Sequence, residues 1–177
     1  MKETRINRKE IYDGKVIHVV LDDVVLEDGT ESKREVVYHN GGVCIALRDD
    51  DGKYFMVRQF RYAIGREMLE FCAGKIEKGE EPLEAIYREC EEELGYKAVD
   101  LVSLGEVIPT CGYCSEVIHL YHARKGEKVG QHFDEDEDLS LKKYSFEEIR
   151  QMIGEGKIND SKTIALMYRI EQKGLHV

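Results

Sequence analysis

The sequence predicts an α/β fold that begins with an antiparallel strand meander. Three observations predict it. Short runs rich in Val, Ile and Tyr alternate with Asp-Gly turns through residues 3–40, further apolar runs of strand length follow at 42–47 and 54–60, and helix signals appear over 80–94 and again after residue 144. With 177 residues, the chain is long enough to bury a core of its own.

The first forty residues are expected to form strands joined by tight turns at Asp13-Gly14 and Asp28-Gly29. The apolar triplets Val19-Val20-Leu21 and Val24-Val25-Leu26 fit burial either against the rest of the chain or against a second copy of it. Arg34, by itself, is typical of a charge at a strand edge.

The strands expected at 42–47 and 54–60 are separated by the turn Asp49-Asp50-Asp51-Gly52. A short strand, Met68–Phe71, then leads to Gly74, where the missing side chain allows the backbone to approach a ligand closely.

Three arginines, Arg58, Arg61 and Arg66, lie at or just after the end of the second of these strands. A guanidinium matches phosphate oxygens two at a time, so one of them could hold a diphosphate. The alternative is that they are surface arginines that balance nearby acids.

Residues 80–94 have the period of an amphipathic helix that stops at Gly95. The apolar stripe expected to face the core is Leu83, Tyr87, Cys90 and Leu94. Glu89, Glu92 and Glu93 fall together on another side of this helix and form one acidic face.

Like charges three or four residues apart destabilise a helix by roughly 0.2–0.5 kcal/mol per pair, so this acidic face needs a reason. It is either a solvated surface or a seat for a hard divalent cation, because Mg²⁺ prefers carboxylate oxygens and is often completed by substrate phosphates. In the second case Arg88 would orient a neighbouring carboxylate.

After this helix, strands are expected at 99–108 and 117–121, with a loop at 109–115 between them and a polar connector at 125–131. The acidic run 134–138 follows. Such runs are usually solvated, but beside a metal-bearing helix this one would be the natural source of a late ligand or a general base.

Two helices close the chain. Ser145 begins a capping box for a helix to about Ile153, and Asp160 starts another that continues through Ile170. The apolar stripe expected on the last helix is Ile164, Met167 and Ile170.

Composition excludes several classes of protein. A net charge of −10, with acids massed at 89–93 and 134–138, argues against a surface for nucleic acid or anionic membrane. No apolar run approaches membrane-spanning length and Met1–Thr4 begins no signal peptide, so we expect a cytoplasmic protein.

The five cysteines are an odd number scattered through apolar segments, which indicates reduced thiols. Cys111 and Cys114 have the spacing of a redox pair or of half a zinc site. A zinc site would require a second pair, and a thioredoxin-type motif should open a helix, whereas this one precedes a strand.

Spacing distinguishes the two readings of the acidic face. Residues 74–96 resemble the Nudix box of the Nudix hydrolases. Five residues separate Gly74 from Glu80, seven separate Glu80 from Arg88, and the segment ends with Arg88-Glu89-Cys90-Glu91-Glu92-Glu93-Leu94-Gly95-Tyr96. The departures are Cys90 and Tyr96, where the family usually has an aliphatic residue. The likeness covers most of the chain and is closest to the ADP-ribose pyrophosphatase branch.

This resemblance implies a Nudix-type α/β/α sandwich with a mixed sheet over residues 41–177, preceded by N-terminal antiparallel strands over 1–40 that serve as a dimerisation element. That branch forms homodimers with a shared active site, so we expect the same here.

The resemblance also implies roles for individual residues. Metal ligands would be the carbonyl of Ala73 with Glu89 and Glu93, and Glu92 would lie on the same face. Glu137, or failing it Glu135, would be a ligand or the base that activates water. Substrate-binding residues would be Arg34, Arg61 and Glu116.

The acidic face, the glycine loop and the arginines favour attack of water on a diphosphate without a nucleophilic side chain. The expected cofactor is Mg²⁺, with Mn²⁺ as a substitute, and the resemblance implies ADP-ribose as substrate, cleaved to AMP and ribose 5-phosphate. Other nucleoside diphosphate sugars, such as GDP-mannose, come next, because Cys111 stands where the branch usually has a proline. The rival functions are a nucleotide-pool sanitising hydrolase and a non-catalytic Nudix regulator that binds a ligand.

Overall fold

The computed structural model describes residues 2–132 and 139–177, which divide into two compact units. The first unit comprises the residues up to 41 together with 108–117. The second comprises 42–107 and the described residues from 118 onward. The loop expected at 109–115 therefore clusters with the N-terminal strands, which its position in the sequence did not indicate.

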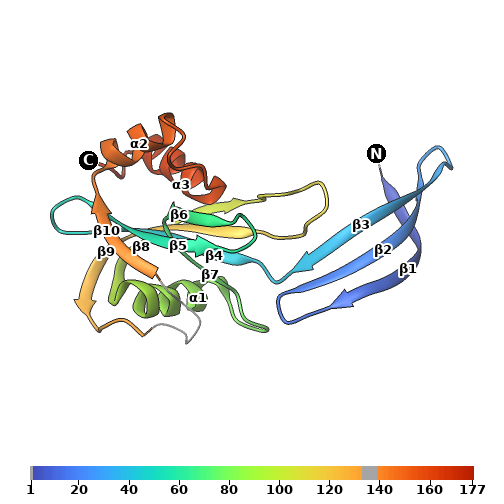
Figure 1. The fold of residues 1–177 in the computed structure, drawn as a ribbon, viewed down its shortest axis with the longest axis horizontal. Coiled ribbons are helices and arrows are strands. Elements are labelled where there is room, and N and C mark those ends of the chain that lie inside the picture. Colours follow the sequence, from blue (N-terminus) through green and yellow to red (C-terminus); the bar gives the residue numbers. More distant parts are fainter. Residues whose placement is uncertain (1, 133–138) are drawn as a thin grey trace. The chain divides into compact units, whose positions relative to one another are not determined.

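The first unit contains a three-stranded antiparallel sheet in the order β1-β2-β3 (Figure 1). Its strands are β1 (Glu3–Asp13), β2 (Ile17–Leu26) and β3 (Glu31–His39). The loop 108–117 attaches to β3 by backbone hydrogen bonds, since Val37 donates to the carbonyl of Tyr113 at 2.8 Å and Ser115 donates to the carbonyl of Val37 at 2.9 Å. The predicted meander is confirmed.

The second unit contains a seven-stranded mixed sheet. Its strands are β4 (Gly42–Arg48), β5 (Tyr54–Arg61), β6 (Arg66–Glu70), β7 (Cys72–Lys75), β8 (Tyr96–Val107), β9 (Ile118–Lys128) and β10 (Leu139–Tyr144). The main order is β10-β5-β4-β9-β8, with β6 on β5 and β7 on β4. β4 and β9 run parallel and the other pairs run antiparallel, which confirms the mixed sheet.

Helices cover both faces of this sheet. Helix α1 (Pro82–Glu89) lies on one face, and α2 (Phe146–Gly154) and α3 (Ser161–Gln172) lie on the other (Figure 1). Consecutive residues of β4 alternate between two buried clusters: Val43, Ile45 and Leu47 pack on the α1 side, and Cys44 and Ala46 on the α2–α3 side. A strand buried on both faces has a continuous apolar run, and the α/β/α sandwich is confirmed.

Three parts of the sheet differ from expectation. The polar connector predicted at 125–131 belongs to β9 as far as Lys128, because its residues pair with β8. The short strand predicted at 68–71 is β6, which begins at Arg66 and pairs with β5, and a strand that was not predicted, β7, follows it and pairs with β4. β10 was not predicted, and it pairs with β5 in unbroken register.

The helix predicted over 80–94 is α-helical only to Glu89 and continues as a π-helical turn, Cys90–Leu94. Gly95 ends it in a left-handed conformation, with φ of 75°, as predicted. The predicted apolar stripe was half wrong, since Cys90 and Leu94 are buried but Leu83 and Tyr87 are exposed. Ala85 and Ile86 take their place against the sheet.

The two C-terminal helices begin where their caps predict. Ser145 accepts a hydrogen bond from the backbone of Glu148, whose side chain accepts one in return, and Asp160 accepts from the backbone of Thr163. On α3, Met167 and Ile170 are buried as predicted, whereas Ile164 is partly exposed and Leu166 is buried instead. None of the helices in the described ranges has the length and hydropathy required to cross a membrane.

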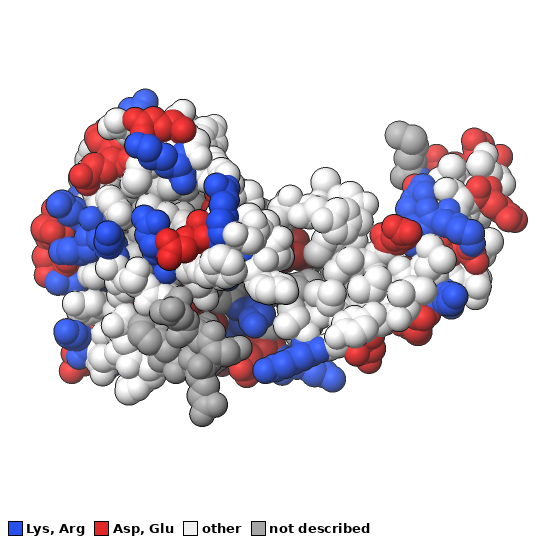
Figure 2. Space-filling view, viewed as in Figure 1, with Lys and Arg blue, Asp and Glu red and all other residues white. Residues whose placement is uncertain are grey.

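Charged side chains of both signs lie side by side on the face of the second unit seen in Figure 2. The described residues on that face therefore present no continuous field of one sign, which is what steers nucleic acid to a surface.

Candidate functional site

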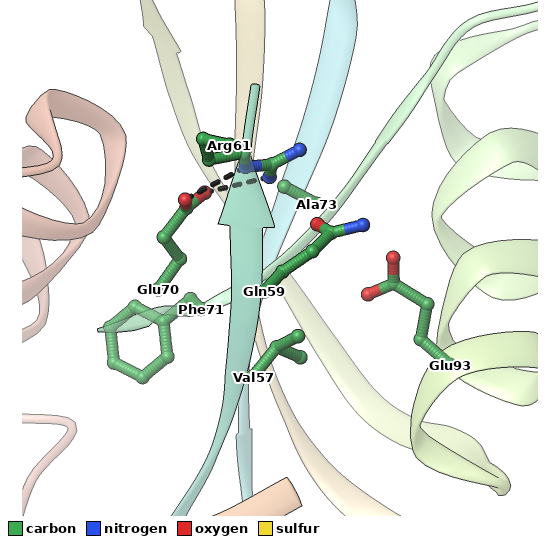
Figure 3. Close-up of a pocket in the computed structure, with 7 residues that line it drawn as sticks. All are labelled: Val57, Gln59, Arg61, Glu70, Phe71, Ala73 and Glu93. Carbon is green, nitrogen blue, oxygen red and sulfur yellow. Dashed lines mark hydrogen bonds and ion pairs between the residues drawn. The ribbon is translucent and has the colours of Figure 1, made fainter. Parts of the chain in front are cut away.

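A pocket in the second unit lies among β5, the β6–β7 segment and the helix that carries the acidic residues (Figure 3). Its lining residues are Val57, Gln59, Arg61, Glu70, Phe71, Ala73 and Glu93. The lining side chains leave about 170 Å³ of space among them, open solvent included, and almost none of it is wide enough for a water molecule. A ligand would therefore contact the edge of this pocket rather than fill it.

Two of the predicted metal ligands are buried at this site. Glu93 is 4% exposed and Glu89 is 8% exposed, while Glu92 is half-buried. Figure 3 shows the Glu93 side chain extending from its helix toward the pocket. The acidic face is thus not a solvated surface at Glu89 and Glu93, which share the buried side of the helix with its apolar residues. The sequence had placed them on another side of the helix from the apolar stripe.

Gly74 is adapted to the carboxylate of Glu89. A Cβ atom at this position would lie 1.8 Å from the Cδ and Oε1 atoms of Glu89. Only glycine therefore allows the carboxylate to lie directly over the backbone next to Ala73. This places an oxygen-rich group against the backbone of Gly74, the residue after Ala73.

Arg88 holds three glutamates together. Its Nε donates to Glu80 at 2.9 Å, and its Nη1 donates to Glu89 at 2.8 Å and to Glu92 at 3.0 Å. Hydrogen bonding to Glu80, with help from Glu89 and Glu92, raises the pKa of Arg88 above its usual value although burial opposes the charge. The same contact lowers the pKa of Glu80. Arg88 thus stays protonated and fixes the orientation of the acidic residues, as proposed from the sequence.

Arg61 is fixed on the opposite side of the pocket. Its Nε and Nη2 donate to the two oxygens of Glu70 at 2.9 and 2.8 Å (Figure 3). Lys162 of α3 also donates to Glu70. Of the three arginines considered from the sequence, only Arg61 lines the pocket, and Arg58 pairs instead with Glu67 at 3.5 Å.

Two predicted substrate-binding residues belong to the first unit. Arg34 donates through Nε and Nη2 to Glu3, at 2.8 and 2.7 Å, and that pairing lowers the pKa of Glu3. Glu116 lies 3.7 Å from the Nδ1 atom of His39. Glu135 and Glu137, the predicted base or late ligand, lie outside the described residues.

The cysteine motif forms part of the loop 108–117. Cys114 donates its backbone N–H to the carbonyl of Thr110 at 3.1 Å, and both Cys111 and Cys114 are free thiols. Across residues 2–132 and 139–177, no three side chains of His, Cys, Asp or Glu converge as a ready-made metal site. At the acidic residues, the guanidinium of Arg88 occupies the position between Glu89 and Glu92.

The donor set nevertheless fits a hard divalent cation. It consists of carboxylate oxygens from Glu89 and Glu93 and the backbone beside Gly74, and the glycine provides the space that a Cβ would fill. Such cations prefer oxygen ligands and bind through one or two carboxylates plus substrate phosphates. A complete ligand shell in the protein alone is not required.

Sequence reasoning missed Gln59, Glu70 and Lys162 as parts of the site. Two signals could have identified the last two. Glu70 is an acid inside the apolar run Met68–Phe71, and Lys162 is a cation in the first turn of a helix, where the helix dipole disfavours positive charge. Both signals favour a partner of opposite charge nearby.

Comparison with known proteins agrees with this geometry. The chain is 34% identical to the ADP-ribose pyrophosphatase of Bacillus subtilis (strain 168), over 98% of this chain and 95% of that protein. It is 38% identical to the methanol dehydrogenase activator of Bacillus methanolicus, over 98% of this chain and 96% of that protein.

A crystal structure of an ADP compounds hydrolase superposes with a TM-score of 0.87, covering 99% of this chain and 96% of that one at 22% identity, which shows a common fold. The profile of the NUDIX domain matches residues 38–167. Gly74 and the buried Glu89 and Glu93 thus lie within that match, and the chain belongs to the Nudix family.

Proposed function

We propose that this protein is a pyrophosphohydrolase that cleaves ADP-ribose to AMP and ribose 5-phosphate with Mg²⁺ as its cofactor. The observation that carries the proposal is a pair of buried carboxylates in a Nudix domain: Glu89 lies over the backbone of Gly74, and Glu93 lines the pocket together with Ala73. Carboxylate and backbone carbonyl oxygens are the ligands that a hard divalent cation prefers. The Bacillus subtilis relative, which is an ADP-ribose pyrophosphatase, supports the choice of substrate.

In this proposal, Glu89, Glu93 and the carbonyl of Ala73 would hold the cation, with Glu92 on the same face. When bound, a divalent cation neutralises charge on the diphosphate oxygens and lowers the pKa of a bound water. Arg88 keeps Glu89 and Glu92 oriented through the hydrogen bonds described above.

Arg61 would bind the diphosphate. Two of its nitrogens are bonded to Glu70, and its Nη1 makes no hydrogen bond to any residue that the structure describes. That nitrogen points away from Glu70 (Figure 3) and is positioned to donate to a phosphate oxygen.

Glu137, or failing it Glu135, is proposed as the group that accepts a proton from the attacking water. Glu137→Gln is then expected to lower kcat and leave KM nearly unchanged, because the amide cannot accept that proton. Steady-state kinetics on the variant test this, and an effect confined to KM would assign Glu137 to binding instead.

We further propose a cytoplasmic homodimer in which the first unit of one subunit supplies Arg34 and Glu116 to the site of the other. The first unit has exposed apolar residues that a partner could cover: Ile6, Ile11, Tyr12 and Ile17. The five cysteines, all of them free thiols, support a reducing compartment. A monomeric mass by sedimentation velocity would exclude the shared site.

The most direct test of the substrate is a screen of the purified protein against nucleoside diphosphate compounds, with identification of the products. We expect ADP-ribose to give the highest kcat/KM, with GDP-mannose and other nucleoside diphosphate sugars below it. Activity should disappear with a chelator and return with Mg²⁺ or Mn²⁺. Preference for oxidised nucleoside triphosphates would instead show a pool-sanitising enzyme.

A second candidate function is activation of a dehydrogenase, which the 38% identical Bacillus methanolicus relative favours. An assay of a methanol dehydrogenase with wild-type protein and with Glu93→Gln separates the possibilities. Stimulation that needs Glu93 depends on hydrolysis, whereas equal stimulation by both proteins indicates binding alone.

A further inference from the structure

Lys162 lies behind the pocket rather than in it, and it shares one carboxylate with Arg61. Glu70 accepts two hydrogen bonds from Arg61 and one from the ammonium of Lys162, which also donates to Asp160 at 2.9 Å. The four side chains form an alternating chain of charges: Arg61, Glu70, Lys162 and Asp160.

This chain of charges is removed from water. The side chain of Glu70 is 4% exposed and that of Lys162 is 12% exposed. Burial opposes the charged form of Lys162, but Asp160 and Glu70 outweigh it and raise the pKa of Lys162. Burial likewise opposes the charge on Glu70, but Arg61 and Lys162 outweigh it and lower the pKa of Glu70. Both groups are therefore ionised at neutral pH.

The start of α3 holds Lys162 in place. Asp160 accepts from the backbone of Thr163 at 3.0 Å and from its hydroxyl at 2.6 Å, and that hydroxyl accepts from the backbone of Phe71 at 3.0 Å. The helix is thereby tied to the residue that follows Glu70. The ammonium of Lys162 sits at a fixed point although the dipole of its own helix disfavours it there.

The arrangement affects the charge that Arg61 presents to the pocket. A carboxylate bonded to Arg61 alone would neutralise that guanidinium. Lys162 donates to the same carboxylate, and to the same Oε2 atom that accepts from Nη2 of Arg61. Part of the positive charge on Arg61 therefore remains uncompensated.

We propose that Lys162 is a positioning residue for diphosphate binding: by sharing Glu70 it holds Arg61 in place and leaves its charge available to the substrate. The proposal rests on the proposed function, in which Arg61 binds the diphosphate. Lys162 itself does not touch the ligand.

Lys162→Met keeps the length of the side chain and removes its charge. We expect KM for ADP-ribose to rise about tenfold, the effect of weakening one charge-assisted hydrogen bond, with kcat within about twofold of wild type. Lys162→Arg restores the charge and should recover part of the loss. Lys97→Met is the matched control, because Lys97 pairs with Glu127 on the surface, and it should leave KM unchanged.

A double variant separates this role from a merely structural one. In Glu70→Gln/Lys162→Met, the group that would neutralise Arg61 is itself neutral, so KM should fall back toward the wild-type value. If Lys162 only secures α3, the double variant should be no better than Lys162→Met, and thermal unfolding should show the defect instead. Recovery of KM supports the proposal, and its absence overturns it.

The affinity for ADP-ribose, measured by calorimetry without metal on the same proteins, distinguishes the proposed function from the proposed role of Lys162. Wild-type protein that binds ADP-ribose but does not hydrolyse it when Mg²⁺ is added contradicts the proposed function alone. An active enzyme whose KM and affinity are unchanged by Lys162→Met contradicts the role of Lys162 alone.

Discussion

Glu93→Gln is expected to lower kcat for ADP-ribose by about a hundredfold or more, because the amide offers a neutral oxygen where a divalent cation requires a carboxylate. The fold should be retained. Glu93 is 4% exposed, and removal of a buried charge does not open a cavity. Steady-state kinetics with Mg²⁺, together with thermal unfolding of the same sample, test both parts.

Glu91→Gln is the matched control for this variant. It makes the same chemical change in the same π-helical turn, but Glu91 does not line the pocket. Its kcat should stay within about twofold of wild type. Near-normal turnover by Glu93→Gln would remove the metal assignment of this residue.

Gly74→Ala is expected to reduce kcat/KM by about ten- to a hundredfold, because the added methyl group must displace the carboxylate of Glu89. The clash is with the far end of a side chain, so we expect Glu89 to move and the fold to survive, at a cost of about 1–3 kcal/mol in the free energy of unfolding. Kinetics and urea denaturation measure the two effects separately.

The control for this substitution is Gly154→Ala at the end of α2. A Cβ there meets nothing within 4 Å, and its backbone is not left-handed. It should leave activity unchanged. A Gly74→Ala enzyme with normal activity and normal affinity for Mn²⁺ would show that the position of Glu89 over this backbone has no catalytic role.

Much of the fold could be predicted because its signals are local. Gly95 stops its helix through a left-handed conformation, Ser145 caps α2 with its own hydroxyl, and the continuous apolar run of β4 indicates a strand buried on both faces. Each of these features depends on a few adjacent residues and on simple stereochemistry.

The remaining features depend on contacts between distant segments. The helical period used for residues 80–94 assumed an α-helix as far as Leu94, and the π-helical turn changes the direction of every side chain after Glu89. β10 is polar and short, and it is a strand because β5 offers it an edge. These features appear only when the chain is folded.

The residues of the candidate site divide into local and distant ones in the same way. The glutamates and Gly74 lie within one motif, so spacing alone brought them together. The pairing of Glu70 with Lys162 joins residues 92 positions apart, and no local pattern connects them. The burial of Glu89 and Glu93 likewise follows from packing against the sheet. Helical periodicity had assigned the buried side of this helix to other residues.

The central claim is that Glu89 and Glu93 hold a divalent cation that carries the substrate's diphosphate. A crystal structure with Mn²⁺ and a non-hydrolysable analogue of ADP-ribose tests it most directly, because anomalous scattering locates the ion. The account predicts Mn²⁺ at about 2.0–2.3 Å from oxygens of both carboxylates, with the diphosphate between the ion and Arg61. An ion and ligand bound elsewhere, with both carboxylates uncoordinated, would contradict it.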